Sequence, residues 1–310
     1  MSFQPQFRKF HEAIQLKRLN QGKELYDKAE RVLTRMREKK MPSKFETFPQ
    51  GSYAMDTGVK PLDGDYDIDM GIVFPLDHGT VDPCKVKGWV FEAVKEHTAR
   101  VEWRRSCITV YYQKERELLY HVDLAILAKH PTSGRLHLAL GKQNASADQQ
   151  WQPDDRKGFM EAVENRFSGE DAVQFRRVIR YLKRWRDVHF PREGRAAPTG
   201  LAFTVAALQW FQPRRPGGEY DDLGATLALA SSLRQRFTQA SDKATGNRFH
   251  RLVLRFPNEP HDDILVRMSN QQMQEFYQRL EKLIGWLEEA QRTGSVAPLR
   301  RAFGDEFPER

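Results

Sequence analysis

The chain has 310 residues, of which 39% are hydrophobic and 30% charged, so it can bury a core and is not a disordered protein. No apolar run reaches the roughly 20 residues of a membrane span, and the polar start lacks a signal-peptide core, so we expect a cytoplasmic protein without membrane partners. The net charge of +8 favours polyanions such as nucleic acid, anionic lipid or triphosphates, although a solvated basic surface gives the same balance.

The predicted elements fall into three parts. Apolar residues recur at three- and four-residue steps from Phe7 to Lys40, which predicts one long helix that Pro42 ends. From Phe45 to Ala128 the period changes to two, which predicts strands with one helix inserted over 85–97. The strand-like runs include 107–112 and 118–127, and the polar residues 128–156 indicate a boundary between lobes.

Helical periodicity returns in the last part of the chain, over 171–189, 199–212 and 270–291. Strands followed by helices predict an α+β fold with two lobes and a cleft between them. We therefore expect a long helix over 1–40 that bridges the lobes, a mixed-sheet core over 41–150 and a helical lobe over 151–310.

Aspartates alternate along one predicted strand. Asp67 and Asp69 share a parity with Asp63 and Asp65, and strand pairing is expected to begin near Tyr66 because Gly64 indicates a turn. Side chains of one parity point to one face of a strand, so Asp67 and Asp69 lie together. Like charges so close raise one another's pKa unless a cation neutralises them. The pattern favours a site that binds cations.

A third acid, Asp123, lies in the middle of a strand whose apolar face is formed by Val122, Leu124 and Ile126. A neighbouring strand would bring it about 4.8 Å from the first pair. Three converging carboxylates favour Mg²⁺ over zinc. The alternatives are an acidic surface hairpin or a calcium loop, although the spacing of an EF-hand, with its Glu at the twelfth position, is missing.

The pair Gly51 and Ser52 precedes Asp67 by about fifteen residues. At the start of a helix, such a pair offers backbone N–H groups and a hydroxyl to phosphate oxygens. Most Gly-Ser pairs are ordinary turns, so this one gains meaning only from the acidic strand that follows it. Together they indicate phosphate chemistry beside a metal site.

On these motifs the sequence resembles the DNA polymerase β-like nucleotidyltransferases. Within them it is similar to the bacterial CD-NTases, the cGAS/DncV-like enzymes of CBASS anti-phage systems, which are relatives of oligoadenylate synthase. The resemblance rests on four segments, 51–57, 60–69, 180–185 and 198–201. It implies a polymerase-β-like catalytic core over 41–150 and an oligoadenylate-synthase-like helical lobe over 151–310.

The resemblance also implies roles for single residues. Asp67, Asp69 and Asp123 would bind two Mg²⁺ ions, or Mn²⁺, and Asp123 would help to activate the attacking ribose hydroxyl. The triphosphate would be held by Gly51, Ser52, Lys183 and Thr199. The implied substrates are ATP, GTP or pyrimidine nucleoside triphosphates, and the implied product is a cyclic oligonucleotide, expected to be a cyclic dinucleotide, that acts on a CBASS effector. A monomer is expected.

Other interpretations stay open. An enzyme of this fold could instead add nucleotides to RNA, which the charge of +8 favours, or to a small-molecule acceptor. A catalytically silent nucleotide- or RNA-binding scaffold is disfavoured because all three aspartates are present. Lys183 could be an ordinary surface residue, and Thr199 could simply cap the helix that follows it.

Overall fold

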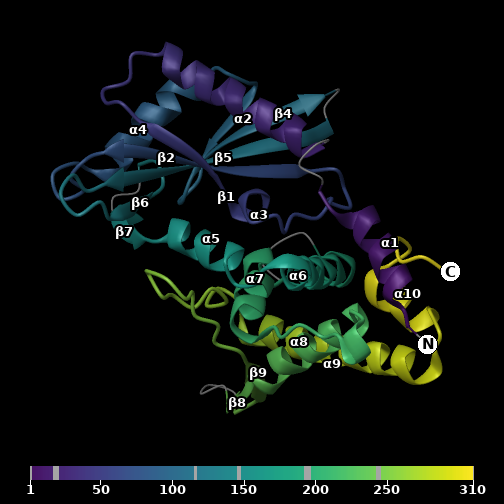
Figure 1. Ribbon diagram of the computed structural model, residues 1–310. Helices are drawn as coiled ribbons and strands as arrows, with labels where there is room; N and C mark the ends of the chain where they lie inside the picture. Colours follow the sequence, from purple (N-terminus) through teal and green to yellow (C-terminus); the bar gives the residue numbers. More distant parts are fainter. Residues whose placement is uncertain are drawn as a thin grey trace.

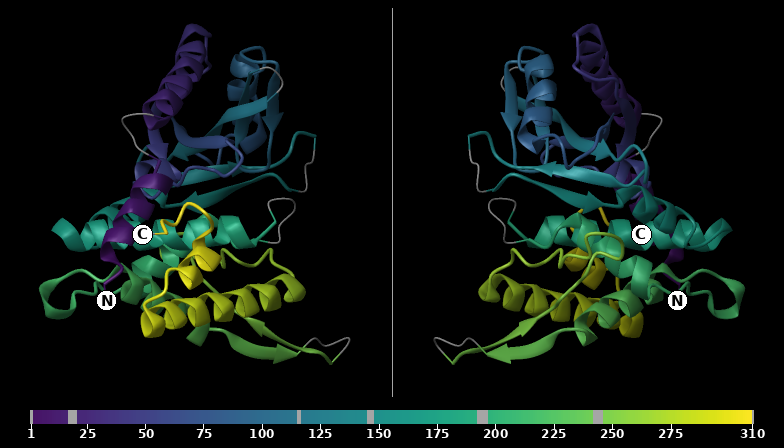
Figure 2. Two further views of the ribbon diagram at one scale, coloured as in Figure 1. Left: turned by 90° about the vertical axis from the view of Figure 1, so that its right-hand side faces the viewer. Right: turned by 90° about the vertical axis from the view of Figure 1, so that its left-hand side faces the viewer.

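The computed structural model describes residues 2–16, 21–114, 117–144, 148–191, 197–241 and 246–309. Figure 1 shows two lobes, with a sheet and its helices in one and a bundle of helices in the other. Two views from the sides, in Figure 2, show that the first helix and the C-terminal segment both lie beside the helical lobe. No helix in the described residues is long and apolar enough to cross a bilayer.

The sheet of the first lobe is mixed. Within the described residues, seven strands are paired. Along the sheet they are β1 (Glu46–Gln50), β2 (Tyr66–Pro75), β5 (Glu117–Lys129), β4 (Ile108–Lys114) and β3 (Arg100–Trp103). In addition, β6 (Leu136–Leu140) pairs with β5, and β7 (Gln150–Asp154) pairs with β6. Only β2 and β5 are parallel among these pairs. Because β2 and β5 are parallel and in register, acidic residues at paired positions of the two strands lie side by side.

Helices α2 (Gln21–Glu38) and α4 (Pro83–Val94) cover one face of this sheet (Figure 1). Their apolar residues and the inward side chains of β2, β4 and β5 form one core. This leaves the lower end of β2 and the short helix α3 (Gly51–Ala54) facing the helical lobe (Figure 1). The helix predicted over 85–97 is observed over Pro83–Val94, and it begins earlier because Asp82 caps its start by accepting a hydrogen bond from the Lys85 amide.

The prediction of one long helix over residues 1–40 was wrong. Helix α1 (Gln4–Ile14) ends where Gln15 turns to extended backbone and pairs with Val59, and α2 begins at Gln21. The apolar spacing continues across both helices, but they face different cores. Phe7 and Phe10 pack into the helical lobe, whereas the apolar residues of α2 pack against the sheet. The spacing of apolar residues predicts a helix, but it does not show which hydrophobic core the helix packs against.

The helical lobe contains α5 (Arg156–Glu164), α6 (Gly169–His189), α7 (Gly200–Trp210), α8 (Asp222–Gln235), α9 (Asn270–Thr293) and α10 (Ala297–Phe303), with the 3-10 turn η2 (Pro216–Gly218) and a hairpin of β8 (Thr238–Ser241) and β9 (Arg248–Arg251). The three helices predicted for this lobe match α6, α7 and α9. Helices α5, α8 and α10 and strands β6, β7, β8 and β9 were not predicted. The domain boundaries at 40 and 150 stay predictions.

Candidate active site

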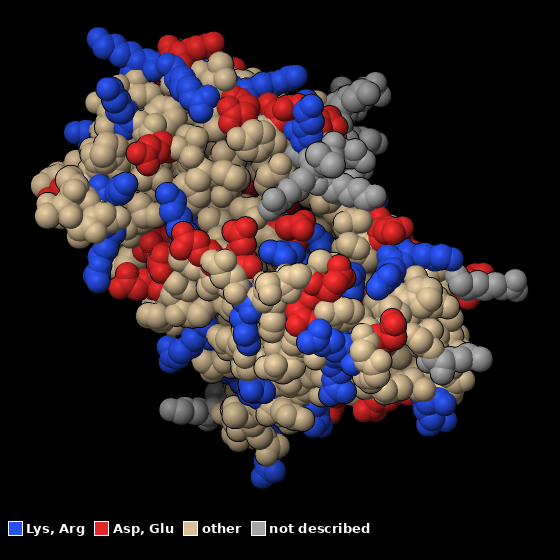
Figure 3. Space-filling model, viewed as in Figure 1, with Lys and Arg blue, Asp and Glu red and all other residues tan. Residues whose placement is uncertain are grey.

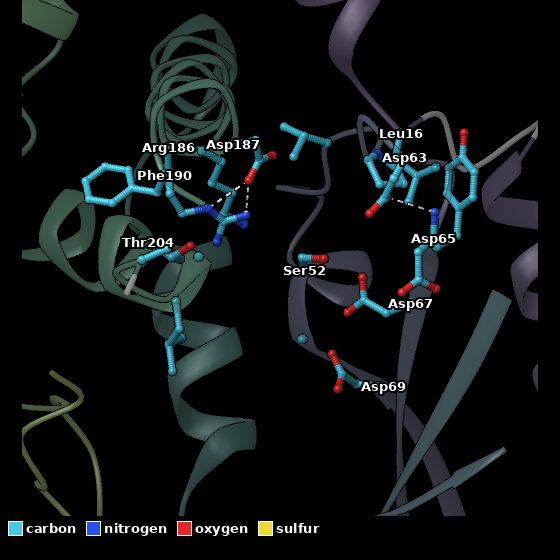
Figure 4. A pocket seen from close by; sticks show the side chains of 18 of the residues that line it. Leu16, Ser52, Asp63, Asp65, Asp67, Asp69, Arg186, Asp187, Phe190 and Thr204 are labelled. Carbon is cyan, nitrogen blue, oxygen red and sulfur yellow. Dashed lines mark hydrogen bonds and ion pairs between the residues drawn. The ribbon is translucent and has the colours of Figure 1, made fainter. Parts of the chain in front are cut away.

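The acidic face of β2 forms one wall of a cavity. Strand pairing begins at Tyr66, as expected, and Ile68 and Met70 are 1% exposed beneath the acids. Asp67 is exposed and Asp69 is half-buried on the opposite face of the strand. Alternation therefore places two carboxylates over an apolar core, and both point into the cavity in Figure 4.

Asp123 stands beside Asp69 because the parallel register of β2 and β5 makes them partners. The hydroxyl of Thr109, on the other neighbouring strand, donates to Asp123 Oδ1 at 2.5 Å. This hydrogen bond fixes one oxygen of Asp123 in the sheet. The expected neighbouring strand is therefore β5, and its register brings Asp123 next to Asp69.

Negative charge at this wall is poorly compensated. Burial, together with the nearby carboxylates of Asp67 and Asp123, raises the pKa of Asp69 to about 7, whereas Arg156 and His121 act in the opposite sense. Arg156 is itself engaged by Asp154 at 2.6 and 2.7 Å. The wall therefore carries more negative charge than its own cations neutralise, which favours an added cation.

The Gly-Ser turn approaches this wall closely. Gly51 begins α3 with φ of 68°, and a Cβ placed on it would lie 1.9 Å from Asp69 Oδ2. Only glycine fits this backbone and this contact. Ser52 follows on the same turn and lines the cavity beside Asp67 (Figure 4). The expected helix start at Gly51 is confirmed, and it puts backbone N–H groups beside the acids.

The opposite wall is cationic and belongs to α6. Lys183 is 5% exposed, and its ammonium donates to the carbonyl and the hydroxyl of Thr57, both at 3.0 Å. Burial lowers the pKa of Lys183 to about 7, with Arg186 and Arg180 adding to the effect and Asp67 opposing it. Arg186 pairs with the adjacent Asp187, one of its hydrogen bonds measuring 2.8 Å.

Between the two walls lies a cavity of about 600 Å³. Carboxylates enter it from β2 and the Arg186–Asp187 pair enters from α6, with Ser52 between them (Figure 4). Apolar side chains complete it, among them Leu16, Tyr66, Phe190 and Leu201. On the outer surface, acidic side chains gather along the boundary between the lobes (Figure 3). A cleft with one acidic wall, one cationic wall and apolar flanks suits a ligand with phosphates, a polar centre and a flat ring.

Five of the predicted site residues line the cavity: Gly51, Ser52, Asp67, Asp69 and Lys183. Asp123 lies behind them in the sheet. Thr199 does not line it; this residue is exposed at the N-cap of α7, and its side chain makes no cap hydrogen bond. The structure thus gives no contact that supports the predicted role of Thr199.

Sequence reasoning missed Arg186, Asp187 and Thr204. Thr204 lies further along α7, is fully buried and lines the cavity, yet its hydroxyl has no hydrogen-bond partner in the described residues. A buried hydroxyl without a partner is unfavourable, so a ligand or water is expected there. Arg186 could have been found from its position three residues after Lys183 on one helix. Nothing in the sequence distinguished Thr204 from its neighbours.

The three aspartates supply the oxygen donors that Mg²⁺ prefers, and their uncompensated charge fits a divalent cation. Among the described residues, no three His, Cys, Asp or Glu side chains already surround a single cation position. Donor type and charge therefore fit a metal, and closure of the carboxylates around it would accompany binding.

Comparison with known proteins adds independent findings. Residues 45–127 match the family model described as cyclic GMP-AMP synthase DncV-like, nucleotidyltransferase domain. A cyclic GMP-AMP synthase of Escherichia albertii is 26% identical over 171 residues, which are 52% of this chain and 36% of that protein. The chain thus matches little more than a third of this curated relative's length.

Solved structures show the same fold over nearly the whole chain. The Bradyrhizobium diazoefficiens CD-NTase CdnG in complex with GTP has a TM-score of 0.72 and 18% identity, with 97% of this chain and 95% of that chain covered. Escherichia coli MS115-1 CdnC with ATP has a TM-score of 0.67 and 14% identity, with 99% of each chain covered. Vibrio cholerae DncV with nonhydrolyzable GTP has a TM-score of 0.64 and 19% identity, with 86% and 70% covered. The predicted α+β fold is confirmed.

Proposed function

We propose that this chain, which belongs to the DncV-like CD-NTase family of nucleotidyltransferases, joins nucleoside triphosphates into a cyclic oligonucleotide. The observation that carries the proposal is the cavity itself. It places the Asp67 and Asp69 carboxylates opposite Lys183 and Arg186, beside the Gly51 turn. Phosphoryl transfer needs such a site, with one side for cations and another for phosphate oxygens.

The residues of the cationic wall and of the Gly-Ser turn would hold the donor triphosphate. Ser52 and the Gly51 backbone offer donors from the sheet lobe, and Lys183 and Arg186 offer charge from α6. We assign the hydroxyl contact from α7 to Thr204, since its hydroxyl is buried at the cavity without a partner, whereas Thr199 lies outside. Arg186 would exchange its contact with Asp187 for the phosphates, a stronger bidentate partner for guanidinium.

The acidic wall would orient the reaction. A ribose hydroxyl of one nucleotide attacks the α-phosphorus of the other, a new P–O bond forms, the bond to the β-phosphate breaks, and pyrophosphate leaves. Asp67, Asp69 and Asp123 would hold two Mg²⁺ ions, or Mn²⁺, and these supply charge neutralisation for the attacking and leaving oxygens when bound. Asp123, held in place by Thr109, would draw the proton from the attacking hydroxyl.

We further propose that the product is a cyclic dinucleotide signal that activates a CBASS effector in anti-phage defence. The apolar flanks of the cavity, formed by Tyr66, Phe190 and Leu201, give room for bases on either side of the reacting phosphate. Among the related structures, Vibrio cholerae DncV binds nonhydrolyzable GTP and Escherichia coli MS115-1 CdnC binds ATP, and we expect these nucleotides or pyrimidine triphosphates here.

The test is incubation of the purified protein with Mg²⁺ and all four ribonucleoside triphosphates, followed by phosphatase treatment and mass spectrometry. A phosphatase-resistant cyclic species that the Asp67→Asn variant does not make would support the proposal and identify the bases. Linear products would contradict cyclisation.

A second candidate is nucleotide addition to RNA or to a small-molecule acceptor, which the net charge of +8 favours. Labelled triphosphate incorporated only when RNA or an acceptor extract is present, by the wild type but not by Asp67→Asn, would favour this candidate over cyclic product formation.

A further inference from the structure

We propose that Thr57 is a positioning residue for nucleotide binding, which holds the Lys183 ammonium at the cavity so that its remaining N–H faces the triphosphate. The inference rests on the proposed function and deepens it. Thr57 is fully buried and does not itself line the cavity, so it acts through Lys183.

Thr57 links the Gly-Ser turn to α6, the two elements that would hold the triphosphate. Its amide donates to the Ser52 carbonyl at 2.9 Å, which ties it to the Gly-Ser turn. Its carbonyl and hydroxyl both accept from Lys183 at 3.0 Å, which ties it to α6. Thr57 therefore bonds directly to both Ser52 on the sheet lobe and the ammonium on the helical lobe.

A second buried lysine shows why this arrangement leaves a donor for a ligand. An ammonium has three donors. In Lys87 all three are used, since it donates to the carbonyls of Arg104, Arg105 and Gly141 at 2.7, 2.9 and 2.7 Å. Lys183 donates only to Thr57 among the described residues, so one N–H stays available at the cavity. Lys87 has the contacts of a structural lysine, and Lys183 those of a binding one.

The Thr57 hydroxyl can be removed without releasing its loop. Arg180 donates to the carbonyls of Asp56 and Gly58, and Arg184 donates to the carbonyl of Lys60 at 2.9 Å. These contacts anchor the loop to α6 from both sides of Thr57. In Thr57→Val the carbonyl contact to Lys183 remains, so the variant should fold and lose only the hydroxyl contact.

The experiment compares the full-length wild type, Thr57→Val, Thr57→Ser and the matched control Thr226→Val. Thr226 is also fully buried, but its hydroxyl donates to the Asp222 carbonyl within α8, away from the cavity. Binding of inorganic tripolyphosphate and of nonhydrolysable GTP and ATP analogues is measured with Mg²⁺, together with KM, kcat and Tm. Tripolyphosphate reports on phosphate contacts alone.

We expect Thr57→Val to weaken tripolyphosphate and nucleotide binding about ten-fold and to raise KM by a similar factor, with kcat changed less. Thr57→Ser should restore binding, and Thr226→Val should lower Tm while it leaves binding unchanged. Wild-type binding in Thr57→Val, failure of Thr57→Ser to restore it, or an equal loss in Thr226→Val would each overturn the role of Thr57. Absence of nucleotide binding in the wild type would instead contradict the proposed function.

Discussion

The two walls of the cavity handle charge in opposite ways. On β2, the pKa of Asp69 is raised to about 7 by burial and by the carboxylates of Asp67 and Asp123, with little compensation. On α6, Lys183 lines the cavity while its neighbours Arg180 and Arg184 lie outside it, and backbone carbonyls of the loop over 56–60 accept from all three buried cations. The acidic wall needs an external partner, whereas the cationic wall is already assembled and keeps one donor for a ligand.

This difference indicates a division of labour. An uncompensated wall gains from a cation that arrives with the substrate, so its residues should control the chemical step. A wall that is held rigid by its own backbone is preorganised, so its residues should control binding. Variants on the two walls should therefore change different kinetic constants.

The largest effect is expected on the acidic wall. Asp67→Asn and Asp69→Asn remove a charge that we propose binds Mg²⁺ and keep the shape of the site, so turnover should fall by roughly a thousand-fold or more. Mass spectrometry of the products and a thermal melt measure this. Asp69→Asn should keep or slightly raise Tm, because it removes a repelled charge. Unfolding together with loss of activity would point to a structural acidic cluster instead.

On the cationic wall, Lys183→Ala should raise the apparent KM for triphosphate by roughly ten- to a hundred-fold and lower the maximal rate less, because charge-assisted contacts to phosphate are lost. Initial rates across a range of triphosphate concentrations at saturating Mg²⁺ measure both constants. An unchanged KM would show that Lys183 does not bind the triphosphate. A change confined to kcat would contradict the assignment of binding to the cationic wall and of the chemical step to the acidic wall.

A third variant tests whether burial of a lysine matters in itself. Lys87→Met leaves three carbonyls without their donor in the sheet lobe, so the free energy of unfolding should fall by about 2–4 kcal/mol. KM should stay within about two-fold of wild type. Urea unfolding and steady-state kinetics on the same preparation measure the two effects. A large increase in KM would mean that the two buried lysines are not functionally distinct.

The smallest expected effect is the change of thermal stability with pH. The pKa of folded Asp69, about 7, lies above its usual value of 3.8, so the folded state binds the extra proton between those values. Its contribution is therefore present at low pH and lost as pH rises through 7. Without divalent cations, wild-type Tm should fall by roughly a few degrees more than that of Asp69→Asn between pH 5.5 and 7.5, and Mg²⁺ should reduce the difference. If Tm fell equally with pH for the wild type and Asp69→Asn in EDTA, this expectation would be contradicted.

Local patterns made one wall predictable and left most of the other hidden. Asp67, Asp69 and Gly51 follow from a period of two and from a turn, which a few neighbouring residues determine. Thr57 and Lys183 are 126 residues apart in sequence, and their contact depends on how α6 packs against the loop. Lys183 was reached only through family resemblance, and Thr204 by no route. The break between α1 and α2 was missed for the same reason, since it depends on which core each helix enters.

Gly51 constrains how this protein can change over generations. A methyl group there would occupy the place of the Asp69 carboxylate, 1.9 Å away, on a backbone whose φ of 68° side chains rarely adopt. A descendant that replaces Gly51 would have to move Asp69 as well, and with it the proposed cation site. The proposed phosphate-binding turn and the proposed metal ligand are therefore inherited as one unit, and a lineage that loses the glycine should be searched for loss of catalysis, even where every aspartate survives.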